Sequence, residues 1–186
     1  MTDQAQLIHL LAARSARRGN FTLASGRQST LYIDARLTTM TPEGQRIIGR
    51  LGLATIRASG WDSDAVGGLT LGADPIAYAI CHASADDVAP LRAFTVRKEP
   101  KGHGTGRQVE GPVSAGDRVV VVEDVITTGG SATRAVEALR RAGIVPVGIL
   151  ALVDRQEGGR EALESLGLPV RALATAADVV PLITSS

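Results

Sequence analysis

Two adjacent acids, Glu123 and Asp124, stand between an apolar run and a turn rich in hydroxyl groups and glycine. The run, residues 119–122, is typical of a strand buried on both faces of a parallel sheet, so the acids are expected at the carboxyl end, where open α/β sheets bind ligands. The turn, residues 127–131, precedes a helical pattern over residues 132–142 and offers backbone N–H groups and a helix N-terminus to an anion. Because carboxylates bind divalent cations and sugar hydroxyls, the segment indicates a sugar phosphate with Mg²⁺.

The second candidate is the polar segment from Arg97 to Arg107, which holds both lysines of the chain, Lys98 and Lys101, together with His103. Its proline and glycines leave it without packing anchors, and loops of this length in compact domains are often mobile lids. A cationic lid stabilises negative charge that develops on a departing polyanion. The plainer alternatives are a solvated basic loop here and, at the first segment, two solvated acids with Ser131 capping the helix.

Composition limits the classes of protein to consider. The chain has 186 residues, 44% of them hydrophobic and 3% aromatic, with a formal net charge of +1. That length fits one domain, and the weak charge and scarce aromatic rings argue against a nucleic-acid partner. The single cysteine, Cys81, excludes an internal disulfide. No apolar run is long enough to cross a membrane and the start lacks a signal-peptide pattern, so we expect a cytoplasmic protein.

Helical and strand patterns alternate along most of the chain. This alternation predicts parallel βαβ units, and hence an α/β fold with a central, mainly parallel sheet flanked by helices. Helices are expected over residues 4–18, from Pro42, and over 75–83, 132–142 and 160–166, and strands near 21–27, 31–34, 65–69, 91–96, 119–122, 145–153 and 170–173.

The first segment resembles the motif with which type I phosphoribosyltransferases bind phosphoribosyl pyrophosphate (PRPP). That resemblance implies a Rossmann-like core and a small N-terminal hood, about residues 1–36, within a single domain of residues 1–186. It also implies that Glu123 and Asp124 contact the ribose hydroxyls. The 5′-phosphate would be held by the following turn, which comprises Val125, Ile126, Thr127, Thr128, Gly129, Gly130 and Ser131.

The lysine-containing segment is similar to the mobile catalytic loop of orotate phosphoribosyltransferases. The resemblance implies that Arg97, Lys98, Lys101 and His103 bind pyrophosphate, and that the last three act in catalysis together with Asp124. In that family the loop reaches the active site of the neighbouring subunit, which implies a homodimer.

Two further segments resemble the orotate-binding parts of the same family. Residues 21–27 are similar to the hood segment that holds the pyrimidine ring, which implies contacts from Ser25, Gly26 and Arg27. Residues 154–158 are similar to a strand end whose arginine, here Arg155, pairs with the orotate carboxylate. The resemblance also implies a contact between Thr127 and orotate. A guanidinium fork suits a carboxylate, although an exposed surface ion pair is the alternative for this arginine.

Two positions depart from the family pattern. Ala24 stands where several members carry a lysine, and the nearby Arg27 is a candidate replacement for its charge. Residues 69–75 also lack a lysine that some members have, which leaves the backbone N–H groups of Gly72 and Ala73 to face pyrophosphate.

Together the resemblances imply that the chain joins orotate to the ribose of PRPP, giving orotidine 5′-monophosphate and pyrophosphate in de novo pyrimidine (UMP) biosynthesis. The Mg²⁺ would arrive with PRPP, near Asp124. One alternative is a phosphoribosyltransferase for another base. The other is a regulator that binds PRPP without catalysis; such proteins often bind nucleic acid, and this chain has no basic surplus for that purpose.

Overall fold

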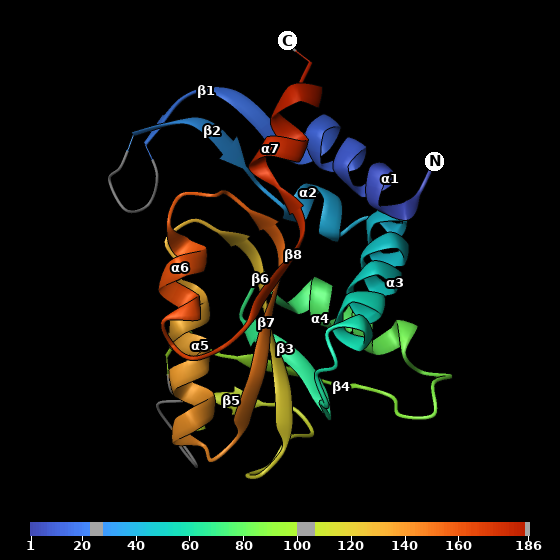
Figure 1. Ribbon diagram of the computed structural model, residues 1–186, viewed down its shortest axis with the longest axis vertical. Helices are drawn as coiled ribbons and strands as arrows, with labels where there is room; N and C mark the ends of the chain where they lie inside the picture. The colour runs from blue at the N-terminus through green and yellow to red at the C-terminus, as the bar shows by residue number, and fades with distance from the viewer. Residues whose placement is uncertain (23–27, 100–106, 185–186) are drawn as a thin grey trace.

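The core of the molecule is a six-stranded sheet between two layers of helices (Figure 1). The computed structural model describes residues 1–22, 28–99 and 107–184. Strand order is β5-β4-β3-β6-β7-β8, and every neighbouring pair is parallel except β4 with β5. The expected α/β class is confirmed. The strands are β3 (Ala65–Leu69), β4 (Arg92–Val96), β5 (Val109–Glu110), β6 (Arg118–Ile126), β7 (Val145–Asp154) and β8 (Val170–Thr175).

Helices cover both faces of the sheet. On one face lie α3 (Pro42–Ala58) and α4 (Asp74–Ala83), and on the other α5 (Gly130–Arg141) and α6 (Gly159–Glu164). Along β6, Val120 and Val122 belong to the first core, whereas Val119 and Val121 belong to the second. Burial on both faces explains the unbroken apolar run, since each buried valine stabilises the fold by roughly 1.5–3 kcal/mol.

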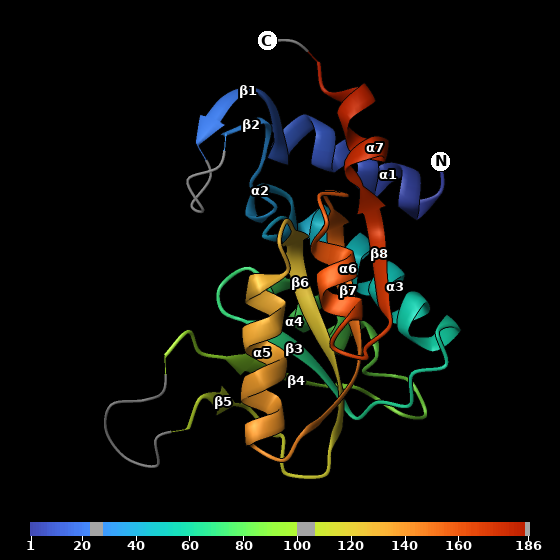
Figure 2. The same cartoon turned by 60° about the vertical axis from the view of Figure 1, so that its left-hand side comes forward.

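The described residues within 1–36, which we call the hood, cover the end of the sheet at which β6 and β7 finish (Figure 2). The hood consists of α1 (Asp3–Leu10), a π-helical turn η1 (Leu11–Ser15), and the antiparallel strands β1 (Ala16–Thr22) and β2 (Gln28–Ile33). It leads into α2 (Arg36–Thr39), and the C-terminal α7 (Ala176–Val179) and η2 (Val180–Leu182) pack beside it. No sequence pattern had predicted these C-terminal turns.

The predicted helix over residues 4–18 is wrong at its end. Helical structure stops at Ser15, and Arg17 and Arg18 lie on β1, where they pair with Tyr32 and Leu31. Tertiary contacts outweigh the helical pattern, since the carbonyl of Ser15 accepts from the backbone N–H of Asp34 at 2.9 Å. The predicted strand near 21–27 shares only residues 21 and 22 with β1, and its remainder lies outside the described residues. The other predicted elements are present within a few residues, β6 runs through both acids to Ile126, and the short β5, which no pattern predicted, follows the segment from Arg97 to Arg107.

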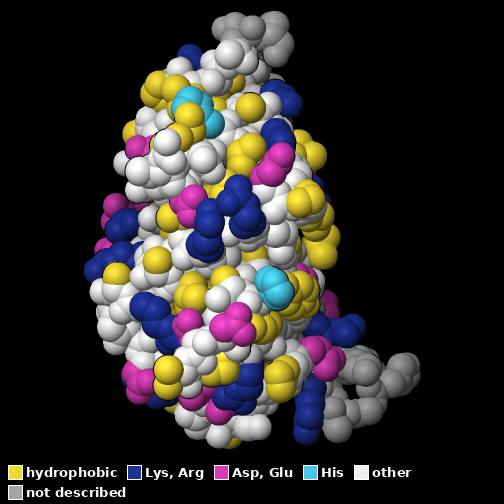
Figure 3. Space-filling model, turned by 90° about the vertical axis from the view of Figure 1, so that its right-hand side faces the viewer, with side chains coloured by type: hydrophobic (Ala, Val, Ile, Leu, Met, Phe, Trp, Pro, Cys, Tyr) yellow, Lys and Arg dark blue, Asp and Glu magenta, His cyan; other side chains and the backbone are white. Residues whose placement is uncertain are grey.

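The surface mixes charges of both signs. On the side where α3 lies, Lys and Arg side chains alternate with Asp and Glu rather than forming one large basic field (Figure 3). Within the described residues, no helix combines the length and apolar character needed to cross a membrane.

Candidate active site

A cavity of about 300 Å³ lies where the hood meets the carboxyl ends of β3 and β6. The hood lines it from Tyr32 to Arg36, and the β3–α4 connection from Leu69 to Gly72. Glu123, Asp124, Ser131, Arg134 and Lys98 complete the wall. The structure therefore brings together the two acids, the start of α5 and one lysine of the predicted lid.

The two acids differ in their surroundings. Glu123 is 7% exposed, and its Oε2 finds no hydrogen-bond partner among the described residues. Burial, and next the neighbouring Asp124, raise the pKa of Glu123 well above its usual value. Asp124 is half-buried, and its Oδ1 accepts from the backbone N–H of Val125 at 2.8 Å. A buried carboxyl oxygen without a partner, next to a cavity, is suited to a ligand hydroxyl.

The β3–α4 connection packs directly against Asp124. A Cβ atom on Gly72 would overlap the Asp124 carboxylate, so only glycine fits at this position without moving that side chain. Asp74 anchors the connection, because its carboxylate accepts from Thr70 Oγ1 at 2.6 Å and from Thr95 Oγ1 at 2.8 Å. The Thr70–Leu71 peptide bond within it is cis.

The predicted phosphate turn is built from the end of β6 and the start of α5. Val125 and Ile126 are strand residues, Thr127 and Thr128 form the bend, and Gly130 and Ser131 open the helix. Gly129 is the N-cap at φ +79°, a left-handed conformation that favours glycine, so Ser131 does not cap the helix. A Cβ on Gly129 would press on Leu163 of α6. The turn thus packs against α6 and presents the N-terminal N–H groups of α5.

The predicted lid is only partly among the described residues. Lys98 is exposed and lines the cavity. Arg97 instead makes a 3.7 Å ion pair with Glu110 of β5. Lys101 and His103 lie outside the described residues.

Arg155 is buried, with 3% of its side chain exposed, so the interpretation as an exposed surface arginine is wrong. Its Nε and Nη2 donate to Glu157 Oε1 at 3.0 and 2.7 Å, and Nη2 also donates to Ser29 Oγ at 2.8 Å. The contact with Ser29 brings the hood against this strand end. The backbone N–H of Arg155 donates to the carbonyl of Ile126 at 3.0 Å, so Arg155 lies beside the end of β6, which Thr127 follows. Ser25, Gly26 and Arg27 lie outside the described residues.

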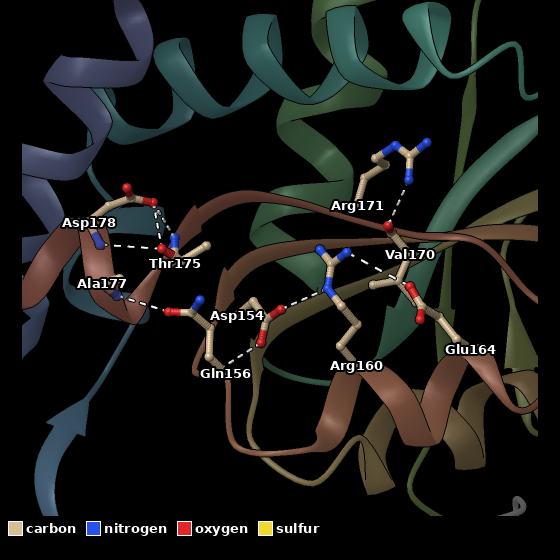
Figure 4. Close-up of polar contacts among 9 residues, drawn as sticks. All are labelled: Asp154, Gln156, Arg160, Glu164, Val170, Arg171, Thr175, Ala177 and Asp178. Carbon is tan, nitrogen blue, oxygen red and sulfur yellow. Dashed lines mark hydrogen bonds and ion pairs between the residues drawn. The ribbon is translucent and has the colours of Figure 1, made fainter.

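A polar network holds the turn that carries Arg155 (Figure 4). Asp154 is 3% exposed; its Oδ1 accepts from the backbone N–H of Gln156 at 2.8 Å, and its Oδ2 from Arg160 Nε at 2.9 Å. Gln156 has a φ of +59°, and its side-chain oxygen accepts from the backbone N–H of Ala177 in α7. Asp154 and Gln156 therefore brace the turn against α6 and α7.

Several residues of the site had no role in the sequence analysis. Ser29, Arg36 and Arg134 contact the site from the hood and from α5. A lone serine or an arginine outside a motif carries no periodic or spacing signal, and only the fold brings these side chains to the cavity.

The paired acids Glu123 and Asp124 suit a Mg²⁺ ion that binds together with the substrate phosphates. Among the residues that the structure describes, no group of three or more His, Cys, Asp or Glu side chains is placed to hold a metal ion. Mg²⁺ usually keeps several waters and binds one or two carboxylates together with substrate phosphates. Asp124, which is half-buried at the cavity, is suited to this kind of partial coordination.

Comparisons with known proteins agree with this geometry. The family model for the phosphoribosyl transferase domain matches residues 41–165. The orotate phosphoribosyltransferase of Rhodopirellula baltica is 48% identical over 180 residues, which cover 95% of this chain and 93% of that protein. The orotate phosphoribosyltransferase of Mycobacterium tuberculosis H37Rv, solved in complex with PRPP, superposes with a TM-score of 0.81 at 41% identity, covering 96% of this chain and 99% of that one.

Proposed function

The chain belongs to the orotate phosphoribosyltransferase family, and from this premise we propose that it transfers the phosphoribosyl group of PRPP to orotate. The products are orotidine 5′-monophosphate and pyrophosphate, in de novo pyrimidine (UMP) biosynthesis. One observation carries the proposal: a paired-acid cavity beside a helix N-terminus lies at the end of β6, and a buried arginine lies at the end of the adjacent β7. The first arrangement suits a ribose phosphate and the second suits a carboxylate.

The residues around β6 hold the donor. The N–H groups at the start of α5 bind the 5′-phosphate, and the acids bind the ribose hydroxyls. Burial raises the pKa of Glu123, which favours a protonated carboxyl that both donates and accepts hydrogen bonds. The carboxylate of Asp124 lies beside the sugar, where it stabilises the positive charge that C1 gains as its bond to pyrophosphate breaks.

Cations hold the leaving group. Lys98 lines the cavity, and we assign the same role to Arg97, Lys101 and His103 by family resemblance. When bound, Mg²⁺ neutralises negative charge on the pyrophosphate, and Asp124 is the residue we expect beside it.

Arg155 recognises the acceptor, orotate. Its guanidinium pairs with the orotate carboxylate, while Ser25, Gly26 and Arg27 contact the ring. Ser29 and Glu157 fix the guanidinium, so the carboxylate meets a group whose orientation is already set. Uracil, which lacks the carboxylate, is then a poor substrate.

The proposed enzyme is a cytoplasmic homodimer of one-domain subunits, with the loop from Arg97 to Arg107 reaching the partner's site. Exposed apolar side chains support a face that a partner subunit covers. Leu71 on the rim of the cavity, Leu37 and Met40 around α2, and Tyr78 on α4 are each 52% exposed. Subunit mixing tests this arrangement. A Lys101→Ala chain and an Asp124→Asn chain, both nearly inactive alone, should regain activity when mixed, because each hybrid dimer has one site with neither change.

The function is tested by mixing the protein with PRPP, Mg²⁺ and orotate and following orotate consumption and pyrophosphate release. Uracil, adenine and hypoxanthine serve as competing acceptors. Turnover with a purine base instead of orotate would support a different phosphoribosyltransferase, and PRPP binding without turnover of any base would support a regulator.

A further inference from the structure

The cavity between the hood and the sheet contains a cation that no motif includes. Among the described residues, three cationic side chains line it: Lys98, Arg134 and Arg36. Lys98 belongs to the predicted lid and Arg134 follows the phosphate turn on α5. Arg36 comes from the hood, at its junction with α2.

Asp34 holds Arg36 in a fixed orientation. Nε of Arg36 donates to Asp34 Oδ1 at 2.8 Å and Nη2 donates to Oδ2 at 2.9 Å, while the backbone N–H of Arg36 also donates to Oδ1 at 3.1 Å. The hydrogen bonds from Arg36 hold the pKa of Asp34 below its usual value. This two-point contact uses the Nε–Nη2 edge of the guanidinium, and Nη1, which has no partner among the residues that the structure describes, is left for a ligand anion. About half of the Arg36 side chain is exposed.

The charges of the residues that line the cavity favour a pyrophosphate group as this anion. The facing β3–α4 connection contributes only neutral side chains to the wall, from Leu69 to Gly72. The 5′-phosphate of a sugar phosphate is served by the N–H groups at the start of α5, but a pyrophosphate group brings further negative charge beside Asp124. Side-chain cations must balance that charge, and guanidinium groups bind phosphate oxygens with two parallel hydrogen bonds.

We propose that Arg36, oriented by Asp34, binds the pyrophosphate group of PRPP and of the released product. The proposal rests on the proposed function, of which it identifies a further binding residue. It gives the cavity a cation from the hood in addition to Lys98, which follows β4, so that residues of two separate segments hold the leaving group.

The test compares Arg36→Gln with Arg46→Gln, which removes the same charge from an exposed position on α3 outside the cavity wall. Because a charge-assisted contact to the leaving group is lost, Arg36→Gln should lower kcat/KM for PRPP about 10- to 100-fold and weaken inhibition by pyrophosphate about 10-fold. The KM for orotate should change less than about 2-fold, and Arg46→Gln should leave all three constants within about 2-fold. Arg36→Lys keeps the charge but not the planar fork. Its kcat/KM for PRPP and its inhibition by pyrophosphate should lie between those of Arg36→Gln and Arg46→Gln.

Equal pyrophosphate inhibition in the two glutamine variants would overturn the proposal. So would an Arg36→Gln variant whose KM for orotate rises as much as its KM for PRPP. Calorimetric titration of the wild type and the Arg36→Gln variant with inorganic pyrophosphate and Mg²⁺ measures pyrophosphate binding directly. It therefore tests the role of Arg36 separately from the proposed function. It needs no orotate, so it decides the role of Arg36 even if the wild-type chain does not turn orotate over.

Discussion

Nη2 of Arg155 donates a 2.8 Å hydrogen bond to Oγ of Ser29, and this contact joins the end of β7 to strand β2 of the hood. The two residues are 126 positions apart in the chain. The guanidinium at this junction is almost fully buried and is paired with Glu157. The position of the guanidinium therefore depends on both the hood and the sheet. An acceptor bound by Arg155 is recognised by a group that both parts of the molecule orient.

Replacing Arg155 by lysine should remove the planar fork while keeping the positive charge. Because a carboxylate then loses a bidentate partner in a buried place, the KM for orotate should rise about 100-fold, and the KM for PRPP should stay within about 3-fold. Steady-state kinetics with each substrate varied in turn measures both. Ser29→Ala removes a single hydrogen bond to the same group and should raise the orotate KM about 3- to 10-fold. A larger change in the PRPP constant than in the orotate constant would contradict the assignment of Arg155.

Gly72 gives a prediction that separates activity from stability. A methyl group at this position overlaps the Asp124 carboxylate, which is the end of a flexible side chain and can turn away at little cost. Gly72→Ala should therefore lower kcat about 10- to 100-fold by displacing Asp124 from the sugar, with the melting temperature changed by no more than about 4 °C. Thermal unfolding and turnover are measured on the same sample. Full activity in this variant would show that Asp124 acts from another position.

Asp154 should act on orotate through Arg155 without touching it. Asp154→Asn keeps the shape but weakens the bonds to Arg160 and to the backbone of Gln156, whose left-handed conformation depends on them. The unfolding free energy should fall by about 1–3 kcal/mol, and the KM for orotate should rise about 10-fold at unchanged KM for PRPP. Asp178→Asn, which weakens the cap of α7 at the edge of the same network, is the control. Equal kinetic effects of the two changes would leave Asp154 a purely structural role.

The sequence predicted the sheet and the turn between β6 and α5 because both follow from local patterns. A strand buried on two faces must be apolar throughout, and a glycine-rich turn between such a strand and a helix is typical of a phosphate-binding site. The segment from Val119 to Ser131 therefore indicated its own structure without help from the rest of the chain, and its phosphate ligand stays a prediction. The same patterns failed at Ser15, where pairing of β1 with β2 ends a helix that the residue types alone would extend.

Burial of polar side chains was the property that the sequence could not reveal. Arg155 follows a strand in an otherwise polar segment, which suggested exposure, and only the hood strand above it makes it buried. Arg36 and Asp34 lie two residues apart, and no pattern in the sequence marks them as part of a site. Their role is inferred from the cavity that both residues line.

Lys101 lies in the predicted lid, outside the described residues, and its role is a prediction from the sequence. Lys101→Ala should lower turnover by roughly 100-fold or more, because positive charge near the departing pyrophosphate is lost. The fold should be unaffected, as judged by circular dichroism and melting temperature. An unchanged rate would remove the lid from the mechanism, whereas an equal loss in Lys98→Ala would give the two lysines similar weight.

The raised pKa of Glu123 predicts how stability depends on pH. Burial favours the protonated carboxyl in the folded state, so the folded protein holds a proton that the unfolded chain releases near its ordinary value of 4.5. Stability from this group is fully present below that pH and is lost as the pH rises toward the folded-state pKa, by up to about 1.4 kcal/mol per pH unit. The glutamine in Glu123→Gln cannot ionise. The unfolding free energy of this variant minus that of the wild type should therefore increase as the pH rises, and then become constant. Urea denaturation of both proteins between about pH 5 and pH 9 measures the difference. A difference that stays constant over this range would show that Glu123 titrates normally in the folded protein.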